Sequence, residues 1–157
     1  MNQQLILLRH AKSVSHLTAS DFNRKLNDKG VLDTPKVAQA FILLNIIPDI
    51  ILCSTAVRTQ ETLALFKQSI ALNSPVEFLD ELYHASASEI YDIILKYPQY
   101  KTIMVVGHNF GISNLANQLS TDGAQEMNTC GLYIFKFPEN IELNKGAILH
   151  YLSPKLI

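Results

Sequence analysis

The stretch Leu5-Ile-Leu-Leu-Arg-His10 ends an apolar run at an arginine and a histidine. Two later runs end in a similar way: Ile50-Ile-Leu-Cys53 leads toward Arg58, and Ile103-Met-Val-Val106 leads into Gly107-His108. Short apolar runs followed by turn-forming or helix-forming residues are typical of buried strands in a parallel sheet. Open α/β sheets bind ligands beyond the carboxyl ends of their strands. The sequence therefore predicts that two arginines and two histidines meet at one edge: Arg9, His10, Arg58 and His108.

The rest of the chain is consistent with an α/β fold, a three-layer α/β/α sandwich with a mostly parallel central sheet. Asn27 is placed to cap a helix in which Pro35 introduces a kink or a restart behind Thr34. Further helices are predicted at 55–72, from Ser86 or Ser88 to about 95, and at 109–119. Further strands are expected at 75–79, 132–137 and 147–152, and a loop at 11–25. With 157 residues, no internal repeat and no long linker, we expect one domain over 1–157.

Charge and cysteine content narrow the class of protein. The chain has 13 Lys and Arg against 14 Asp and Glu, so we expect neither a nucleic acid nor a membrane as partner. Its first residues lack the basic region of a signal peptide and instead predict a strand. Two cysteines without metal-ligand spacing form no disulfide framework. These features favour a cytoplasmic protein.

The chemistry that suits the four side chains is phosphoryl transfer. Arg9 and Arg58 are planar, permanently charged donors that hold phosphate oxygens in pairs. His10 is a histidine that can attack a phosphoryl group and later leave it, forming a covalent intermediate. His108 can donate a hydrogen bond that stabilises the transition state.

Several motifs, in order along the chain, resemble the histidine phosphatase superfamily. They are Leu8-Arg-His-Ala-Lys-Ser13, Arg24 and Leu26 followed by Gly30, Cys53-Ser-Thr-Ala-Val-Arg-Thr-Gln-Glu-Thr62, Leu82-Tyr83, and Val106-Gly-His-Asn-Phe-Gly111. They are most similar to its small branch, the SixA-like phosphohistidine phosphatases. The resemblance implies a phosphoglycerate mutase-like fold and a phosphatase without a cofactor, which is phosphorylated on His10. It also implies that Arg9, Arg58 and His108 surround the phosphate and that Arg24 is a further substrate-binding residue.

The proton donor for the leaving group is the open part of this hypothesis. Glu81 is the nearest candidate in the sequence, with Asp80 and His84 behind it. Small members of the family often manage without a clear acid. The sequence therefore favours a substrate whose leaving group departs easily: phosphohistidine in a protein, or a small phosphorylated molecule.

Two other functions remain open on the sequence alone. A mutase of the phosphoglycerate kind would use the same edge, although the short chain lacks the insertions that enclose its substrate. A non-catalytic module that binds phosphate, or zinc through His10, His84 and His108, is the second, although no local pair has ligand spacing. Cys53 begins a Cys-x4-Arg segment, one residue too short for a cysteine phosphatase loop. The sequence does not specify the oligomeric state.

Overall fold

The computed structural model describes residues 2–157, and its centre is a six-stranded sheet with the strand order β3-β2-β4-β1-β5-β6. The strands are β1 (Gln4–Arg9), β2 (Ile50–Ser54), β3 (Val76–Leu79), β4 (Thr102–Gly107), β5 (Leu132–Lys136) and β6 (Ala147–Leu152). β1 to β4 run parallel to one another, and β5 and β6 are antiparallel to their neighbours. The mostly parallel sheet predicted from the sequence is confirmed.

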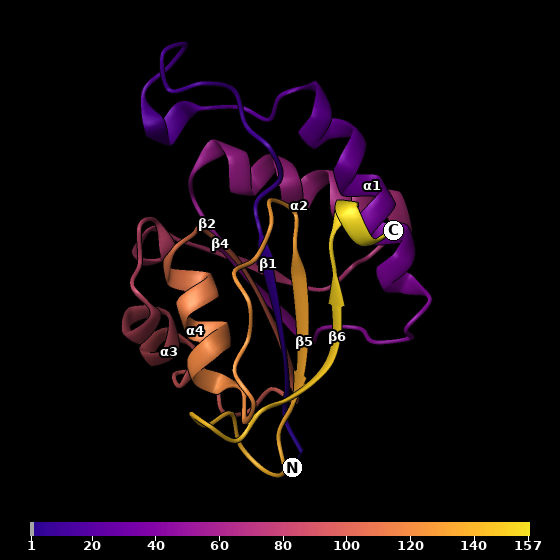
Figure 1. The fold of residues 1–157 in the computed structure, drawn as a ribbon, viewed down its shortest axis with the longest axis vertical. Coiled ribbons are helices and arrows are strands. Elements are labelled where there is room, and N and C mark those ends of the chain that lie inside the picture. Colours follow the sequence, from indigo (N-terminus) through magenta and orange to yellow (C-terminus); the bar gives the residue numbers. More distant parts are fainter. Residues whose placement is uncertain (1) are drawn as a thin grey trace.

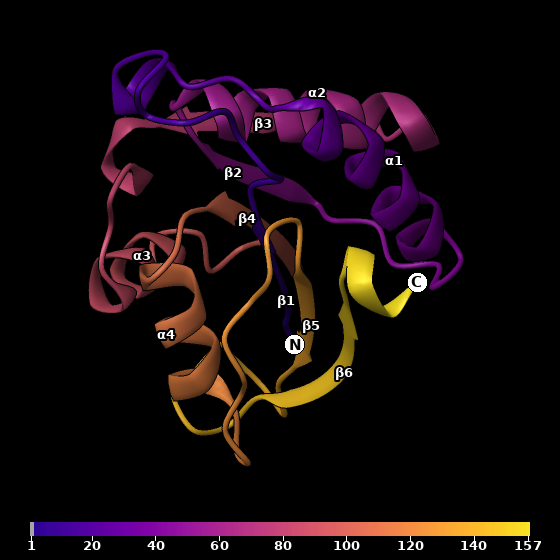
Figure 2. The same cartoon turned by 45° about the horizontal axis from the view of Figure 1, so that its top comes forward.

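Two helices cover each face of the sheet. α1 (Asp28–Ile42) and α2 (Val57–Ile70) lie on one face, and α3 (Ala87–Ile94) and α4 (Gly111–Leu119) on the other (Figures 1 and 2). Three short 3-10 turns complete the fold: η1 (Asp21–Asn23), η2 (Asp80–Leu82) and η3 (Pro154–Leu156). The architecture is the predicted three-layer sandwich.

The alternation of side chains along β1 explains the layers. Leu5 and Leu7 are buried against α3 and α4, whereas Ile6 and Leu8 are buried against α1 and α2. Successive residues of a strand point to opposite faces, so a strand covered on both sides must be apolar throughout. β4 meets the same condition, because all six of its residues are buried.

The helix starts follow the predicted capping chemistry. The Asn27 side chain accepts a hydrogen bond from the Gly30 N–H at 2.9 Å, as expected for an N-cap. Ser86, one of the two predicted caps, begins α3 with a reciprocal capping box to Glu89. α1 continues through Pro35, which excludes a restart behind Thr34 and leaves the kink as the remaining alternative of the two predicted. The Thr34 hydroxyl donates to the Gly30 carbonyl in the turn before the proline.

Two glycines allow loops to approach helices α1 and α4 closely. A Cβ atom on Gly30 would lie 2.2 Å from the Lys12 carbonyl oxygen, and one on Gly111 would lie 1.9 Å from the Ala85 carbonyl oxygen. Only glycine fits at such distances. The segment after β1 and the segment before α3 are therefore packed tightly against α1 and α4.

No helix within residues 2–157 has the length and apolar character needed to cross a membrane.

Candidate active site

The carboxyl ends of β1 and β4 bring two histidines together. The register pairs Arg9 with Gly107, so the next residues, His10 and His108, leave adjacent strands at the same level. The His10 N–H donates to the Gly107 carbonyl at 3.1 Å, and the two imidazole ring centroids are 5.3 Å apart. The parallel register of β1 and β4 is therefore sufficient to place the two histidines side by side.

Arg58 reaches the same point from the first turn of α2. Its side chain is 3% exposed, and its Nε donates to His10 Nε2 at 3.3 Å. Arg9 lies beside them, with one Nη1 hydrogen bond to the Met127 carbonyl at 2.7 Å, while its buried Nε has no partner within residues 2–157. The structure therefore brings all four predicted side chains to one edge of the sheet.

The hydrogen bonds of His10 define its tautomer. Nδ1 lies 2.8 Å from the Ala11 carbonyl oxygen, which can only accept, so Nδ1 carries the hydrogen. Nε2 then holds the lone pair that receives the Arg58 N–H. Burial, together with the charges of Arg58 and Arg9, lowers the pKa of His10 to about 3, although the Ala11 carbonyl opposes the shift. His10 is consequently neutral at physiological pH, with Nε2 available as a nucleophile.

His108 is also a buried, neutral imidazole. Burial and the charges of His10 and Arg58 lower its pKa to about 3. Its Nε2 lies 2.7 Å from Ser54 Oγ, which already accepts a hydrogen bond from the Ala56 N–H. Ser54 can therefore donate its own hydrogen to Nε2, which leaves the hydrogen of His108 on Nδ1. That Nδ1 is buried and has no hydrogen-bond partner among the described residues, which is rare for a buried polar atom.

A carboxylate that the sequence did not single out faces the arginines. Asp21 in η1 accepts hydrogen bonds from Arg24 Nη2 at 2.9 Å, from Arg58 Nη2 at 3.2 Å and from the Tyr83 hydroxyl. Burial alone would raise its pKa, but the hydrogen bonds from Tyr83 and Arg24 and the charge of Arg58 hold the pKa of Asp21 well below its ordinary value. Asp21 is thus ionised at neutral pH. Its i, i+3 spacing from Arg24 was the only signal in the sequence.

These side chains border a cleft of about 330 Å³. It is lined by Arg9, His10, Lys12, Ser13, Asp21, Arg24, Arg58, His84, His108, Asn109 and Thr129. Arg24, predicted as a substrate-binding residue, lies in this wall and also donates to Ser13 Oγ and the Val14 carbonyl. Four of these residues, Arg9, Lys12, Arg24 and Arg58, are cationic and only Asp21 is acidic, which suits an anion.

The predicted proton donor lies elsewhere. Glu81 is an exposed residue of η2 that does not line the cleft, and Asp80 accepts a hydrogen bond from Thr55 on the surface. His84 does line it: its Nε2 lies 3.2 Å from Asp21 Oδ2, and the side chain is 61% exposed. Its backbone φ is 56°, a left-handed conformation that is uncommon for residues other than glycine. Of the three titratable candidates, the structure brings only His84 to the site.

Neither a cysteine nucleophile nor a zinc site gains support from the described residues. Cys53 is fully buried in β2, and burial raises the pKa of its thiol to about 12. Within residues 2–157 no group of three His, Cys, Asp or Glu side chains is arranged to hold a metal ion.

None of the protein-family models matches this chain. Among curated proteins, an uncharacterized chloroplastic protein of Arabidopsis thaliana is 37% identical over 142 residues, which are 83% of this chain and 64% of that protein. The chain thus spans slightly less than two thirds of the length of that relative.

Two solved structures share the architecture. A protein of Agrobacterium tumefaciens, provisionally named phosphohistidine phosphatase SixA, has a TM-score of 0.84 and 24% identity, over 98% of this chain and 99% of that one. The protein histidine phosphatase SixA, solved with tungstate, has a TM-score of 0.81 and 18% identity over the same shares. The chain has the SixA fold, as the motifs implied. At these identities the likeness establishes the fold, and the activity has to be argued from the site.

Proposed function

We propose that this chain is a phosphatase that works through a covalent phosphohistidine on His10. The observation that carries the proposal is the pairing of a neutral His10, with its Nε2 lone pair fixed toward Arg58, and a second buried histidine 5.3 Å away. A nucleophile beside a permanently charged, bidentate donor suits phosphoryl transfer. Tungstate, which accompanies one SixA structure, is an oxyanion similar in shape to phosphate.

In the first step, His10 Nε2 forms a bond to phosphorus as the bond from phosphorus to the leaving group breaks. The leaving group takes the electron pair, and the phosphoryl group is carried on Nε2. The Arg58 N–H that now points at Nε2 can turn to a phosphoryl oxygen, and Arg9 offers its unpartnered Nε. In the second step water attacks phosphorus, Nε2 leaves with its electron pair, and inorganic phosphate is released.

His108 is the proposed donor to the equatorial oxygens. Its Nδ1 is the buried hydrogen-bonding atom without a protein partner, and Ser54 holds the opposite nitrogen. A phosphoryl dianion in the cleft adds negative charge, which raises the pKa of His108 and favours its protonated form. The imidazolium would then stabilise the charge that develops in the transition state.

We assign the proton donor for the leaving group to His84. The nearby carboxylate, Asp21, stays ionised because its pKa is lowered, so it cannot supply a proton. Its Oδ2 lies 3.2 Å from His84 Nε2, a contact that holds the imidazole ring at the cleft. An exposed histidine at the mouth of the cleft can reach a leaving group and exchange its proton with solvent.

The substrate in this proposal is phosphohistidine in a protein or a small phosphorylated molecule, and no cofactor takes part. We also place the protein in the cytoplasm, since Cys53 and Cys130 are both buried free thiols. The Arabidopsis relative is chloroplastic, so fractionation of the native cells is the appropriate measurement of location.

The test is hydrolysis of a chromogenic aryl phosphate by the purified chain in the presence of a metal chelator. We expect turnover that resists chelation and disappears in His10→Ala. Loss of activity with the chelator would favour the zinc alternative. Transfer of the phosphoryl group to an added alcohol, with little free phosphate formed, would favour the mutase. The absence of any turnover with aryl phosphates and with phosphohistidine peptides would refute the proposal.

A further inference from the structure

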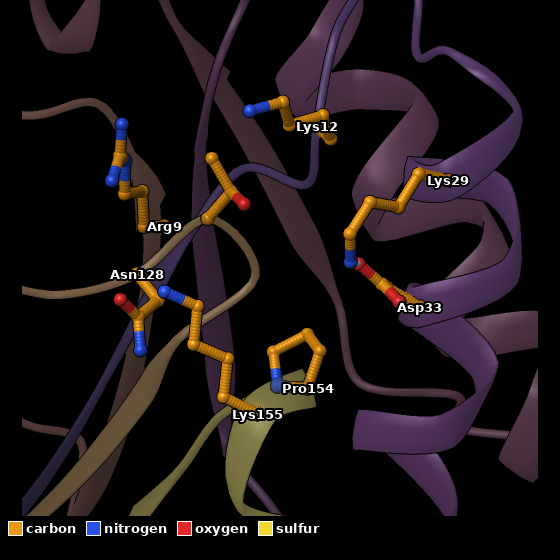
Figure 3. Close-up of a pocket in the computed structure, with 8 residues that line it drawn as sticks. Arg9, Lys12, Lys29, Asp33, Asn128, Pro154 and Lys155 are labelled. Carbon is orange, nitrogen blue, oxygen red and sulfur yellow. Dashed lines mark hydrogen bonds and ion pairs between the residues drawn. The ribbon is translucent and has the colours of Figure 1, made fainter.

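A second cavity, of about 280 Å³, lies beside the catalytic cleft. Arg9, Lys12 and Thr129 line both cavities, so the two are contiguous. The second cavity is completed by Lys29, Asp33, Asn128, Pro154 and Lys155 (Figure 3). The proposed reaction uses none of these five residues.

The charge in this second cavity is strongly positive. Four of its lining residues are cationic and one is a carboxylate, whereas the whole chain has a net charge of −1. The carboxylate of Asp33 is already paired, because Lys29 Nζ lies 2.6 Å from its Oδ2. Lys12 and Lys155 form no ion pair with any acidic side chain within residues 2–157. The cavity thus contains positive charge that the fold does not neutralise.

This charge comes from separate parts of the chain. Lys12 follows β1, Lys29 lies in the first turn of α1, and Lys155 lies in the C-terminal turn η3. In Figure 3, Lys155 extends from that turn toward Asn128, while Lys12 and Arg9 border the side shared with the catalytic cleft. Bringing unpaired cations together opposes folding, because like charges repel. A cluster of this kind is therefore better explained by binding than by stability.

We infer that the second cavity binds a second anionic group of the substrate whose phosphoryl group is transferred to His10. The substrate class is accordingly a small molecule with two anionic groups, a phosphate ester that also bears a carboxylate or another phosphate. This inference rests on the proposed function and deepens it. Ammonium and amide N–H groups are suitable donors to such oxygens. A cavity of about 280 Å³ is at the small end of the range for ligand pockets, so it suits one compact group.

Matched pairs of substrates test this assignment. Phenyl phosphate and 3-carboxyphenyl phosphate have similar leaving groups but differ by one carboxylate. The phosphates of 4-propylphenol and of 4-hydroxyphenylpropionate form a second pair with a longer reach. We expect the carboxylated member of at least one pair to have a KM about tenfold lower, with kcat little changed, and the preference to shrink as salt rises.

Lys155→Gln should abolish this preference and leave the kinetics of the member without the carboxylate unchanged. Lys145→Gln is the matched control, since Lys145 is exposed and precedes β6 at the opposite end of the sheet. It removes the same charge and should keep the preference. A wild-type protein without preference in either pair, or a preference that survives Lys155→Gln, would overturn the inference while leaving the phosphatase proposal intact.

Two further arms separate the remaining outcomes. Calorimetry with His10→Ala measures binding of each pair without turnover, so the second cavity is tested even if no substrate is hydrolysed. Tighter binding of the carboxylated member, again dependent on Lys155, supports the inference. Phosphohistidine peptides with acidic or neutral flanking residues test the other source of an anion. A Lys155-dependent preference for acidic flanks, with none in the small pairs, would overturn the assignment to a small molecule.

Discussion

Arg58 Nε donates a hydrogen bond to His10 Nε2 across 3.3 Å, so the arginine that would hold the phosphate also orients the nucleophile. The contact joins the first turn of α2 to the end of β1, 48 residues apart. It requires His10 to be deprotonated at Nε2, which agrees with its lowered pKa. The Arg58 side chain therefore both orients the nucleophile His10 and selects the tautomer in which His10 Nε2 carries no hydrogen.

His10→Ala should abolish turnover of aryl phosphate while phosphate and vanadate still bind, because Arg9, Arg58 and His108 remain. Rapid quenching of the wild-type reaction with labelled substrate should give acid-labile, base-stable label on His10. His16→Ala is the matched control: His16 is exposed and does not line the cleft, so its loss should leave rates within twofold or so. Near-native rates in His10→Ala would disprove the covalent step.

Arg58→Lys should lower kcat/KM by about 100-fold, since a lysine cannot reproduce the planar fork that contacts both nucleophile and phosphate. Arg24→Lys should have a smaller effect, because three of its hydrogen bonds go to Asp21, Ser13 and Val14 in its own loop. Thermal unfolding of both variants controls for loss of structure. Equal losses from the two substitutions would show that Arg58 has no special role at the nucleophile.

The free energy of unfolding should fall as the pH is lowered from about 6.5 to about 3. His10 and His108 ordinarily titrate near 6.5, but in the folded protein the pKa of each is lowered to about 3. Between these values the unfolded chain binds more protons, so the stabilisation present above pH 6.5 is lost as the pH falls, by up to about 2.7 kcal/mol per pH unit for the pair.

Urea unfolding at pH 7.5, 6 and 5 measures this slope, and the double variant His10→Asn/His108→Asn should flatten it. Asp21 does not interfere, because its lowered pKa affects stability only below about pH 4. If the free energy of unfolding changes with pH equally in the wild type and the double variant over this range, the lowered pKa values of His10 and His108 are contradicted.

His84→Gln should slow alkyl phosphates more than aryl phosphates, because an alkoxide needs a proton to leave whereas a nitrophenolate does not. A series of esters that spans leaving-group pKa should therefore give a steeper dependence in the variant than in wild type. Glu81→Gln is the control, since Glu81 is exposed outside the cleft. A steeper dependence in Glu81→Gln, with none in His84→Gln, would return the role of donor to Glu81.

The sequence by itself determined the sheet and the central site. The runs at 5–8, 50–53 and 103–106 are apolar throughout because both faces of their strands are buried, and parallel strands place their carboxyl ends at one edge. His10 and His108 directly follow the runs at 5–8 and 103–106, and Arg58 lies in the first turn of the helix after the run at 50–53. The meeting of these three side chains could therefore be predicted from local patterns.

Only the tertiary structure decided the remainder of the site. Asp21 lies in a loop without periodicity, and its position depends on contacts to Arg58 and Tyr83, which are 37 and 62 residues away. Glu81 and His84 are three residues apart, yet the path of the chain between η2 and α3 brings only His84 to the cleft. The second cavity joins Lys12, Lys29 and Lys155 from opposite ends of the chain. Such contacts are non-local, so they form only when the packed layers fix how the loops lie across the sheet edge.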